Sequence, residues 1–261
     1  MSDHILVEQD GPIATVIINR PRMRNAIGLA MWTEIAEVTE RLAKDDSVRA
    51  LVFRGAGTDA FASGADISEF EENRKDLASA THYNQQTAAA YRTVRECPKP
   101  TVAMIYGFCM GGAVALALAC DLRFAAEGSR YGIPAARLSI IYPFDSVKQL
   151  VDLVGPATTK DILFSARTLD AAEALRVGFI QQLLPAADLE RYTYEYLTKV
   201  ADNAPLSIQG TKAQVHAMFA GLDEAQRQEL ARLGLLTFES HDFREGTRAF
   251  MEKRAARFLG R

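Results

Sequence analysis

The chain has 261 residues, 48% hydrophobic and 24% charged, which is long enough for one large α/β domain, or for a domain and a smaller appendage, with a substantial core. Its formal charge of −3 gives no electrostatic reason to expect nucleic acid as a partner. The three cysteines lack metal-ligand spacing, which favours reduced thiols in a cytoplasmic protein. No leader-like segment opens the chain and no apolar run reaches about 18 residues, so we expect neither export nor a membrane span.

The first hundred residues alternate between strand-like and helical patterns, as in strands linked by helices. β-Branched and apolar runs predict strands over 13–18 and 50–53. Between them, apolar residues three or four apart predict a helix over 30–44 with one buried face. A long charged helix is predicted over 68–96, where Cys97-Pro98 stops it.

The pattern then repeats with a strand over 101–105 and an apolar helix over 113–119, which is too hydrophobic for a surface position. Further strands are predicted over 121–124 and 179–184. The other segments favour helices, among them 171–177, 187–202, 206–220, 224–238 and 244–257. This order predicts a strand-rich core over residues 1–200 and a helical region over 201–261.

Two familiar kinds of catalytic motif are disfavoured by their context. Residues 55–60 fit G-x-G-x-x-A after a strand, but no helix follows directly and no acidic strand end lies about 20 residues on, which argues against a dinucleotide site. No serine lies in a G-x-S-x-G elbow, and the four histidines lie in terminal or surface-helix segments without an H-E-x-x-H motif. The sequence therefore supports neither a hydrolase triad nor a zinc site.

Two short turns carry most of the functional information. They are residues 60–66, AFASGAD, and residues 107–113, GFCMGGA. Glycines are common in plain turns, but here Gly112 begins the predicted buried helix, where free N–H groups and the helix dipole favour negative charge. Asp66 is placed to cap a following helix. Together the turns predict an oxyanion hole.

Several ordered motifs, spread over essentially the whole chain, match one family. They are Asn19-Arg20-Pro21, Asn25-Ala26, AFASGADI over 60–67, KPTVA over 99–103, Gly107, Gly111-Gly112, Cys120-Asp121, AAEAL over 171–175, Gly178-Phe179-Ile180 and the segment 242–254. With these motifs the chain resembles the crotonase superfamily, the enoyl-CoA hydratase/isomerase proteins.

The resemblance implies an α/β fold, the crotonase (ClpP-like) spiral of ββα units, with a C-terminal helical region used in trimerisation. The expected assembly is a homotrimer or a dimer of trimers. The expected ligand is an acyl-CoA thioester, so coenzyme A arrives as part of the substrate and no separate cofactor is implied.

By motif match, the backbone N–H groups of Ala65 and Gly112 would hold the thioester carbonyl oxygen and stabilise an enolate. Ala62 and Ile67 would line the ligand channel, and Arg22 or Arg24 could meet coenzyme A phosphates. The full set implied to bind substrate or coenzyme A is Arg22, Arg24, Ala62, Ala65, Asp66, Ile67, Gly111, Phe250 and Lys253.

One departure from the family pattern bears on the reaction. Hydratases of this family carry two water-activating glutamates, and the matching positions here hold Ala115 and Ala135. A positioned acid or base contributes about 10²- to 10⁴-fold to a rate. Standard hydration is therefore disfavoured relative to decarboxylation or isomerisation.

Two polar residues beyond the second alanine are candidate catalytic groups. Tyr142 falls where the methylmalonyl-CoA decarboxylase branch, which this chain partly resembles, uses a tyrosine to orient the substrate carboxylate. That branch, however, has histidine at the position of Ala65. Tyr142 could equally be a packed aromatic with a satisfied hydroxyl. Asp145 is a candidate acid or base for isomerisation, or a cap for a helix beginning near Ser146.

We therefore expect an acyl-CoA lyase or isomerase of this family that stabilises a thioester enolate. The alternatives are an enoyl-CoA hydratase that uses other residues and a non-catalytic protein that binds CoA thioesters.

Overall fold

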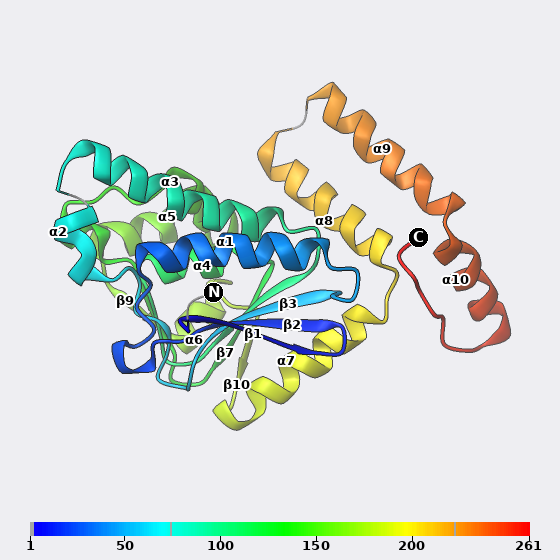
Figure 1. The fold of residues 1–261 in the computed structure, drawn as a ribbon, viewed down its shortest axis with the longest axis horizontal. Coiled ribbons are helices and arrows are strands. Elements are labelled where there is room, and N and C mark those ends of the chain that lie inside the picture. The colour runs from blue at the N-terminus through cyan, green and yellow to red at the C-terminus, as the bar shows by residue number, and fades with distance from the viewer. Residues whose placement is uncertain (1–2, 74, 222) are drawn as a thin grey trace.

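The computed structural model describes residues 3–73, 75–221 and 223–261 and contains two β-sheets (Figure 1). The larger sheet has six strands in the order β1-β2-β3-β5-β7-β10, antiparallel at β1–β2 and parallel elsewhere. Its strands are β1 (Ile5–Asp10), β2 (Ile13–Ile18), β3 (Ala50–Gly55), β5 (Thr101–Ile105), β7 (Leu122–Ala126) and β10 (Gln182–Leu184).

The smaller sheet has the order β4-β6-β8-β9 and is antiparallel only at β8–β9. Its strands are β4 (Ala60–Ala62), β6 (Phe108–Met110), β8 (Arg130–Gly132) and β9 (Thr168–Asp170). The strands β3, β5 and β7 of the large sheet are each followed by a strand of the small sheet and then by helices. This repeated ββα order is the predicted crotonase spiral.

Helices cover both faces of the larger sheet, and α7 lies on the face opposite α1 (Figure 1). Alternate residues of β3 accordingly belong to two different hydrophobic clusters. Leu51 and Phe53 pack with the helices α1 and α4, whereas Val52 packs with Leu189 of α7. This alternation follows from the two-residue period of a strand. The helices concerned are α1 (Leu29–Lys44), α3 (Leu77–Glu96), α4 (Gly112–Ala119), α5 (Phe144–Ser165), α6 (Ala171–Arg176) and α7 (Ala186–Ala201).

The helix predicted over 68–96 is not continuous. It is divided into η2 (Ile67–Glu69), α2 (Phe70–Asn73) and α3, because Asp76 begins a new helix by accepting a hydrogen bond from the N–H of Ser79 at 2.8 Å. The helix predicted over 244–257 instead spans His241–Glu252 and ends where Lys253 adopts φ +54°. The last strand is shorter than predicted, since only Gln182–Leu184 pair with β7.

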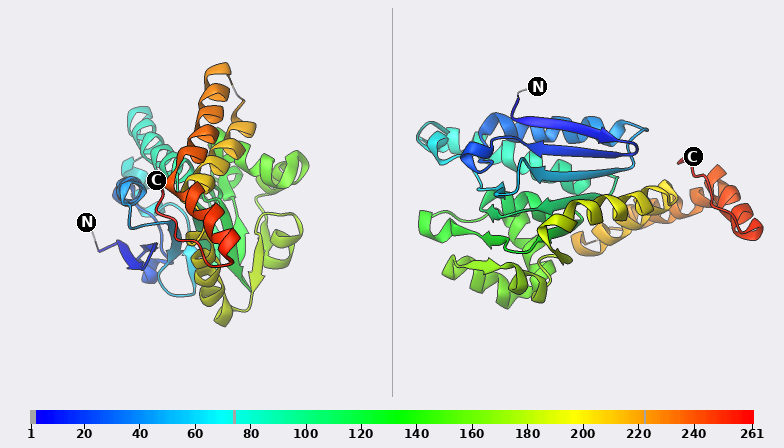
Figure 2. Two further views of the ribbon diagram at one scale, coloured as in Figure 1. Left: turned by 90° about the vertical axis from the view of Figure 1, so that its right-hand side faces the viewer. Right: turned by 90° about the horizontal axis from the view of Figure 1, so that it is seen from below.

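Three C-terminal helices extend away from the sheets, and the second and third lie far from the core (Figure 2). They are α8 (Pro205–Ala220), α9 (Glu224–Glu239) and α10 (His241–Glu252). Lys212 of α8 forms an ion pair with Asp121 of the core at 2.8 Å. The terminal tail folds back, and its Phe258 carbonyl accepts a hydrogen bond from Arg49 at 3.0 Å. Within the described ranges, no helix is both long and apolar enough to span a bilayer.

Candidate oxyanion site

The two turns singled out in the sequence lie against each other in the structure. A Cβ built on Gly64 would stand 2.7 Å from the carbonyl oxygen of Met110 and 3.5 Å from the backbone nitrogen of Gly112. Gly64 also has φ +101°, which L side chains rarely adopt. Glycine is therefore required at position 64 both for the backbone conformation and for the close approach of the second turn.

The first turn is held by backbone hydrogen bonds to the segment that precedes α1. The N–H of Ile27 donates to the carbonyl of Gly64 at 2.8 Å, and the N–H of Asp66 donates to the carbonyl of Ile27 at 3.0 Å. The backbone of Ile27 thus hydrogen-bonds to the residues on either side of Ala65 rather than to Ala65 itself, which is the pattern of a parallel bridge. In the described part of the chain, this arrangement leaves the Ala65 N–H without a backbone acceptor.

The second turn leads into α4. The N–H of Gly111 donates to the carbonyl of Gly132 at 2.8 Å, which fixes the turn against β8 while Gly111 adopts φ +53°. Gly112 is the first helical residue, and the N–H of a first helical residue has no acceptor within its own helix. The helix dipole adds partial positive charge at this end.

Burial and a C-terminal hydrogen-bond donor hold α4 in the core. All its residues after Gly112 are buried, and at its C-terminus the buried Arg123 guanidinium donates to the carbonyls of Ala117 at 3.2 Å and Cys120 at 2.9 Å. Burial lowers the pKa of Arg123 to about 10, which still leaves it charged at neutral pH. The helix α4 is therefore held in place by burial along its length and by the Arg123 donor at its C-terminus.

Tyr142 lies beneath the second turn. Its side chain is 9% exposed, and its hydroxyl donates to the carbonyl oxygen of Gly111 at 2.9 Å. Burial raises the pKa of the hydroxyl well above its ordinary value, so it stays protonated at neutral pH. In this structure Tyr142 is a packed aromatic whose hydroxyl is hydrogen-bonded to the Gly111 carbonyl.

Asp145 lies at the surface of the same region. The helix α5 begins at Phe144 with Pro143 as its N-cap, so the prediction that Asp145 caps this helix is wrong. Its carboxylate is 71% exposed and lies 3.9 Å from the Arg95 guanidinium of α3. Its position in the first turn still places a negative charge at the positive end of the helix dipole.

The two alanines at the glutamate positions differ in their surroundings. Ala115 is 1% exposed within α4, and Ala135 is half-buried in η3 (Pro134–Leu138) and packs against the same core. Sequence reasoning missed Tyr91 of α3, whose hydroxyl would lie 3.1 Å from a Cβ built on Gly112. No motif marks Tyr91, because it lies within a long polar helix and reaches the site only through the packing of α3 on α4.

The residues expected near the first turn differ in their burial and their contacts. Asp66 is buried, caps η2 through Ser68 and pairs with Arg20 at 2.7 Å; hydrogen bonding from Ser68 and Arg20 lowers its pKa. Its predicted capping role is confirmed. Ala62 is fully buried in β4, whereas Ile67 is 65% exposed.

Arginines flank the turn on its solvent side. Arg22 is exposed in η1 (Pro21–Met23), and the exposed Arg24 packs its guanidinium over the ring of Phe108 at 5.2 Å. The carbonyl of Arg24 accepts the N–H of Ser63 at 2.9 Å, so this arginine is attached directly to the first turn.

The chain does not bring Phe250 and Lys253 to the turns. Both lie at the end of α10, which is at the opposite end of the molecule from α2 and the first turn (Figure 1). Phe250 is 87% exposed.

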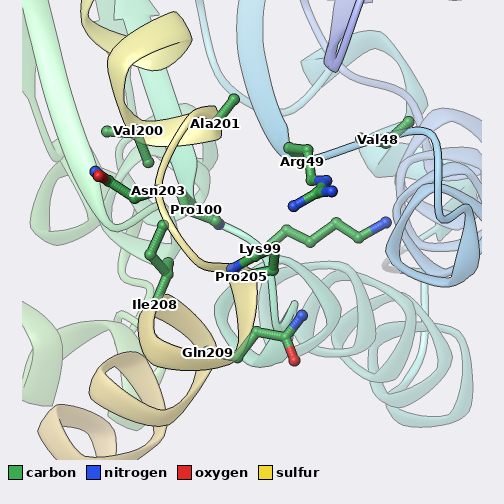
Figure 3. Close-up of a pocket in the computed structure, with 10 residues that line it drawn as sticks. All are labelled: Val48, Arg49, Lys99, Pro100, Val200, Ala201, Asn203, Pro205, Ile208 and Gln209. Atoms are coloured by element: carbon green, nitrogen blue, oxygen red, sulfur yellow. The ribbon is translucent and has the colours of Figure 1, made fainter. Parts of the chain in front are cut away.

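A separate small pocket lies where α8 leaves the core, with Arg49, Lys99 and Pro205 among its lining residues (Figure 3). Its cavity volume is about 30 Å³, on the scale of a water molecule rather than an acyl-CoA. Over the same described ranges, no three His, Cys, Asp or Glu side chains cluster as metal ligands would.

Comparison with known proteins assigns the family. A model of the enoyl-CoA hydratase/isomerase family matches residues 8–261. The short-chain-enoyl-CoA hydratase of Clostridium acetobutylicum is 30% identical over 97% of this chain and 96% of its own. The 2,3-dehydroadipyl-CoA hydratase of Escherichia coli is 30% identical over 98% and 99%.

A solved structure agrees in fold along the whole chain. The enoyl-CoA hydratase/carnithine racemase of Magnetospirillum magneticum superposes with a TM-score of 0.93 at 33% identity, covering 100% of this chain and 97% of the other. The motifs, the paired sheets and these matches agree, and the chain belongs to the enoyl-CoA hydratase/isomerase family.

Proposed function

We propose that this protein binds an acyl-CoA thioester and stabilises its enolate with the backbone N–H groups of Ala65 and Gly112. The observation that carries the proposal is the juxtaposition of two turns whose hydrogen bonding leaves these N–H groups without backbone acceptors in the described part of the chain. Preorganised donors of this kind favour a developing oxyanion, and losing one costs about 3 kcal/mol of transition-state stabilisation.

We further propose that the reaction is decarboxylation or isomerisation rather than standard hydration. Decarboxylation needs no base: the bond from Cα to the carboxylate breaks, its electron pair becomes the enolate, and carbon dioxide leaves. The absence of carboxylates at Ala115 and Ala135 supports a reaction of this kind. For isomerisation, the exposed carboxylate of Asp145 is the candidate that moves a proton.

Hydration by other residues is the second candidate. It is favoured by the curated relatives, because those at about 30% identity over nearly the whole chain are named as hydratases. Asp145 would then activate water in place of the missing glutamates. A third candidate is a non-catalytic protein that retains the thioester site.

The reactions are separated by incubating the protein with crotonyl-CoA, methylmalonyl-CoA and a 3-enoyl-CoA while mass spectrometry follows each thioester. We expect turnover of methylmalonyl-CoA or the 3-enoyl-CoA to exceed crotonyl-CoA hydration. Efficient hydration that survives both Tyr142→Phe and Asp145→Asn would contradict our account of the missing glutamates. Tight CoA-thioester binding without turnover would instead favour the non-catalytic protein.

We also propose a cytoplasmic homotrimer or dimer of trimers, with residues 1–200 as the core and 201–261 as the trimerisation region. Support comes from apolar side chains that the single chain leaves exposed on the last two helices, since large apolar patches mark interfaces. They include Leu235 at 68%, Phe238 at 61%, Phe250 at 87% and Met251 at 72% exposure. Phe250 and Lys253 would then contact coenzyme A bound by another copy, while Arg22 and Arg24 meet its phosphates.

The assembly is tested by light scattering on the Phe250→Asp and Leu235→Asp variants. We expect a trimer or hexamer for the unmodified protein and smaller species for these variants, because a buried charge is costly at an apolar interface. Leu77→Asp is a matched control, since Leu77 is 85% exposed on the distant helix α3. A monomeric unmodified protein would contradict the proposed assembly.

A further inference from the structure

The two peptide groups that carry the proposed N–H donors share one feature. In the peptide Gly64–Ala65, the N–H belongs to Ala65 and the carbonyl of Gly64 accepts a hydrogen bond from Ile27 N–H at 2.8 Å. In the peptide Gly111–Gly112, the N–H belongs to Gly112 and the carbonyl of Gly111 accepts from the Tyr142 hydroxyl at 2.9 Å. Each peptide thus receives a hydrogen bond at its carbonyl and presents its N–H on the other side.

We propose that Tyr142 is a positioning residue of the oxyanion site, which polarises and holds the Gly111–Gly112 peptide and has no direct contact with the substrate. The inference rests on the proposed function of that site. A hydrogen bond received at a peptide carbonyl withdraws electron density from the peptide, so the same group donates more strongly through its N–H.

The surroundings of Tyr142 fit this role better than direct contact with a substrate carboxylate. The hydroxyl has one proton, and the Gly111 carbonyl accepts it. To donate to a substrate carboxylate, the Tyr142 hydroxyl would have to give up its hydrogen bond to that carbonyl. Tyr142 is also only 9% exposed. The carbonyl of Gly111 also accepts from Val114 N–H at 3.0 Å, so Tyr142 acts on a carbonyl already fixed at the start of α4.

The two peptides differ in the group that donates the hydrogen bond to their carbonyl. Ile27 provides a backbone N–H, which no substitution except proline removes. Tyr142 provides a side-chain hydroxyl, which can be removed or strengthened without altering the backbone. The identity of residue 142 therefore adjusts the strength of the Gly112 donor, beside the fixed contribution of the backbone N–H groups of Val114 and Ala115 to the same carbonyl.

The size of the effect follows from two magnitudes. One oxyanion donor contributes about 10²- to 10³-fold to turnover. Polarisation by one hydrogen bond changes a neighbouring bond by about 10–30%. We therefore expect Tyr142→Phe to lower kcat roughly two- to eight-fold with little change in KM, because the stronger donor matters most when negative charge develops.

The distinguishing experiment measures the thioester carbonyl directly. Acetyl-, butyryl- and hexanoyl-CoA labelled with ¹³C at the carbonyl are bound to the protein, and infrared difference spectra record the carbonyl stretch. We expect a shift to lower frequency with the unmodified protein and a smaller shift with Tyr142→Phe. Replacing Tyr142 by 3-fluorotyrosine, a stronger hydrogen-bond donor, is expected to enlarge the shift.

Tyr194→Phe is the matched control, because it also removes a hydroxyl with a hydrogen bond, to Thr15 at 2.7 Å, but lies on α7. It is expected to leave the carbonyl shift and kcat unchanged. If Tyr142→Phe gives the same spectrum and kcat as Tyr194→Phe, the positioning role is refuted while the oxyanion site stands. If none of the labelled thioesters binds, or the unmodified protein leaves the bound carbonyl unshifted, the proposed site itself fails.

Discussion

The core around α4 and the C-terminal helices are stabilised in different ways. In α4, every side chain after Gly112 is buried, and a buried arginine caps the helix. The structure describes every residue of α9. None of these residues is buried, and several large apolar side chains are exposed. The core therefore buries its apolar side chains within one chain, whereas the C-terminal helices leave apolar surface exposed.

In the C-terminal region, hydrogen bonds and ion pairs take the place of part of the buried apolar packing. Asp242 of α10 is buried, and its carboxylate accepts the N–H groups of Leu259 and Gly260, both at 2.7 Å. Glu245 binds Arg254 through both guanidinium nitrogens and accepts the N–H of Arg257 at 2.9 Å. The tail is thus held to α10 by carboxylates rather than by a hydrophobic core.

Gly64→Ala is expected to have the largest effect on the core's chemistry. The added Cβ would approach the Met110 carbonyl to 2.7 Å in a backbone with φ +101°, so the two turns must separate. We expect turnover of the acyl-CoA substrate to fall by about 10²- to 10³-fold, as for loss of one oxyanion donor. Steady-state kinetics measure this loss.

Gly57→Ala provides the control for that experiment. Gly57 also has a positive φ, +72°, but a Cβ there would meet nothing within 4 Å. It carries the same kind of backbone strain without the clash, so its turnover should stay near the unmodified value. Equal losses in the two variants would mean that strain alone, and not the contact between the turns, controls activity.

Arg123→Met tests how far the core depends on its buried cation. The substitution keeps most of the side-chain volume but leaves the carbonyls of Ala117, Cys120 and Phe179 without this donor. We expect the free energy of unfolding to fall by about 3 kcal/mol, measured by urea denaturation.

The corresponding change in the C-terminal region is Arg254→Met. Arg254 makes ion pairs with Glu245 and Glu252 at the surface, where solvent screens charges. Its removal is expected to change the free energy of unfolding much less than Arg123→Met. Similar losses for both arginines would remove the contrast drawn between the two regions.

The smallest expected effect is a pH dependence confined to the tail. Hydrogen bonds from Arg254 and the Arg257 N–H lower the pKa of Glu245 from 4.5 to about 2. Because the folded pKa is depressed, this stabilisation is fully present above pH 4.5 and is lost as the pH falls toward 2. The protection factors for amide hydrogen exchange of residues 254–258 should therefore decrease as the pH falls across this window.

Glu245→Gln is expected to abolish most of that pH dependence and to leave the tail exchanging faster at neutral pH. Exchange in β5, measured in the same samples, controls for global acid unfolding. An unmodified tail whose exchange keeps a constant protection factor down to pH 2 would show that Glu245 does not hold it.

Some elements were predictable because their signals are local. The stripe Met31, Ile35, Val38 and Leu42 gave α1, and the uniformly apolar run after Gly112 gave a buried α4. Strands of the second sheet were not predicted, because each has only three residues and shows no period. The break before α3 depends on one cap, Asp76, inside a continuous helix-favouring composition.

The sequence by itself determined the family, the two glycine turns and the absence of glutamates at Ala115 and Ala135, since residue identities and motif order need no coordinates. Only the tertiary structure decided that Gly64 contacts the second turn and that the hydroxyl of Tyr142 donates to Gly111, 31 residues away. These contacts join segments that are distant in sequence, so they depend on how two sheets and α4 pack together rather than on any local pattern.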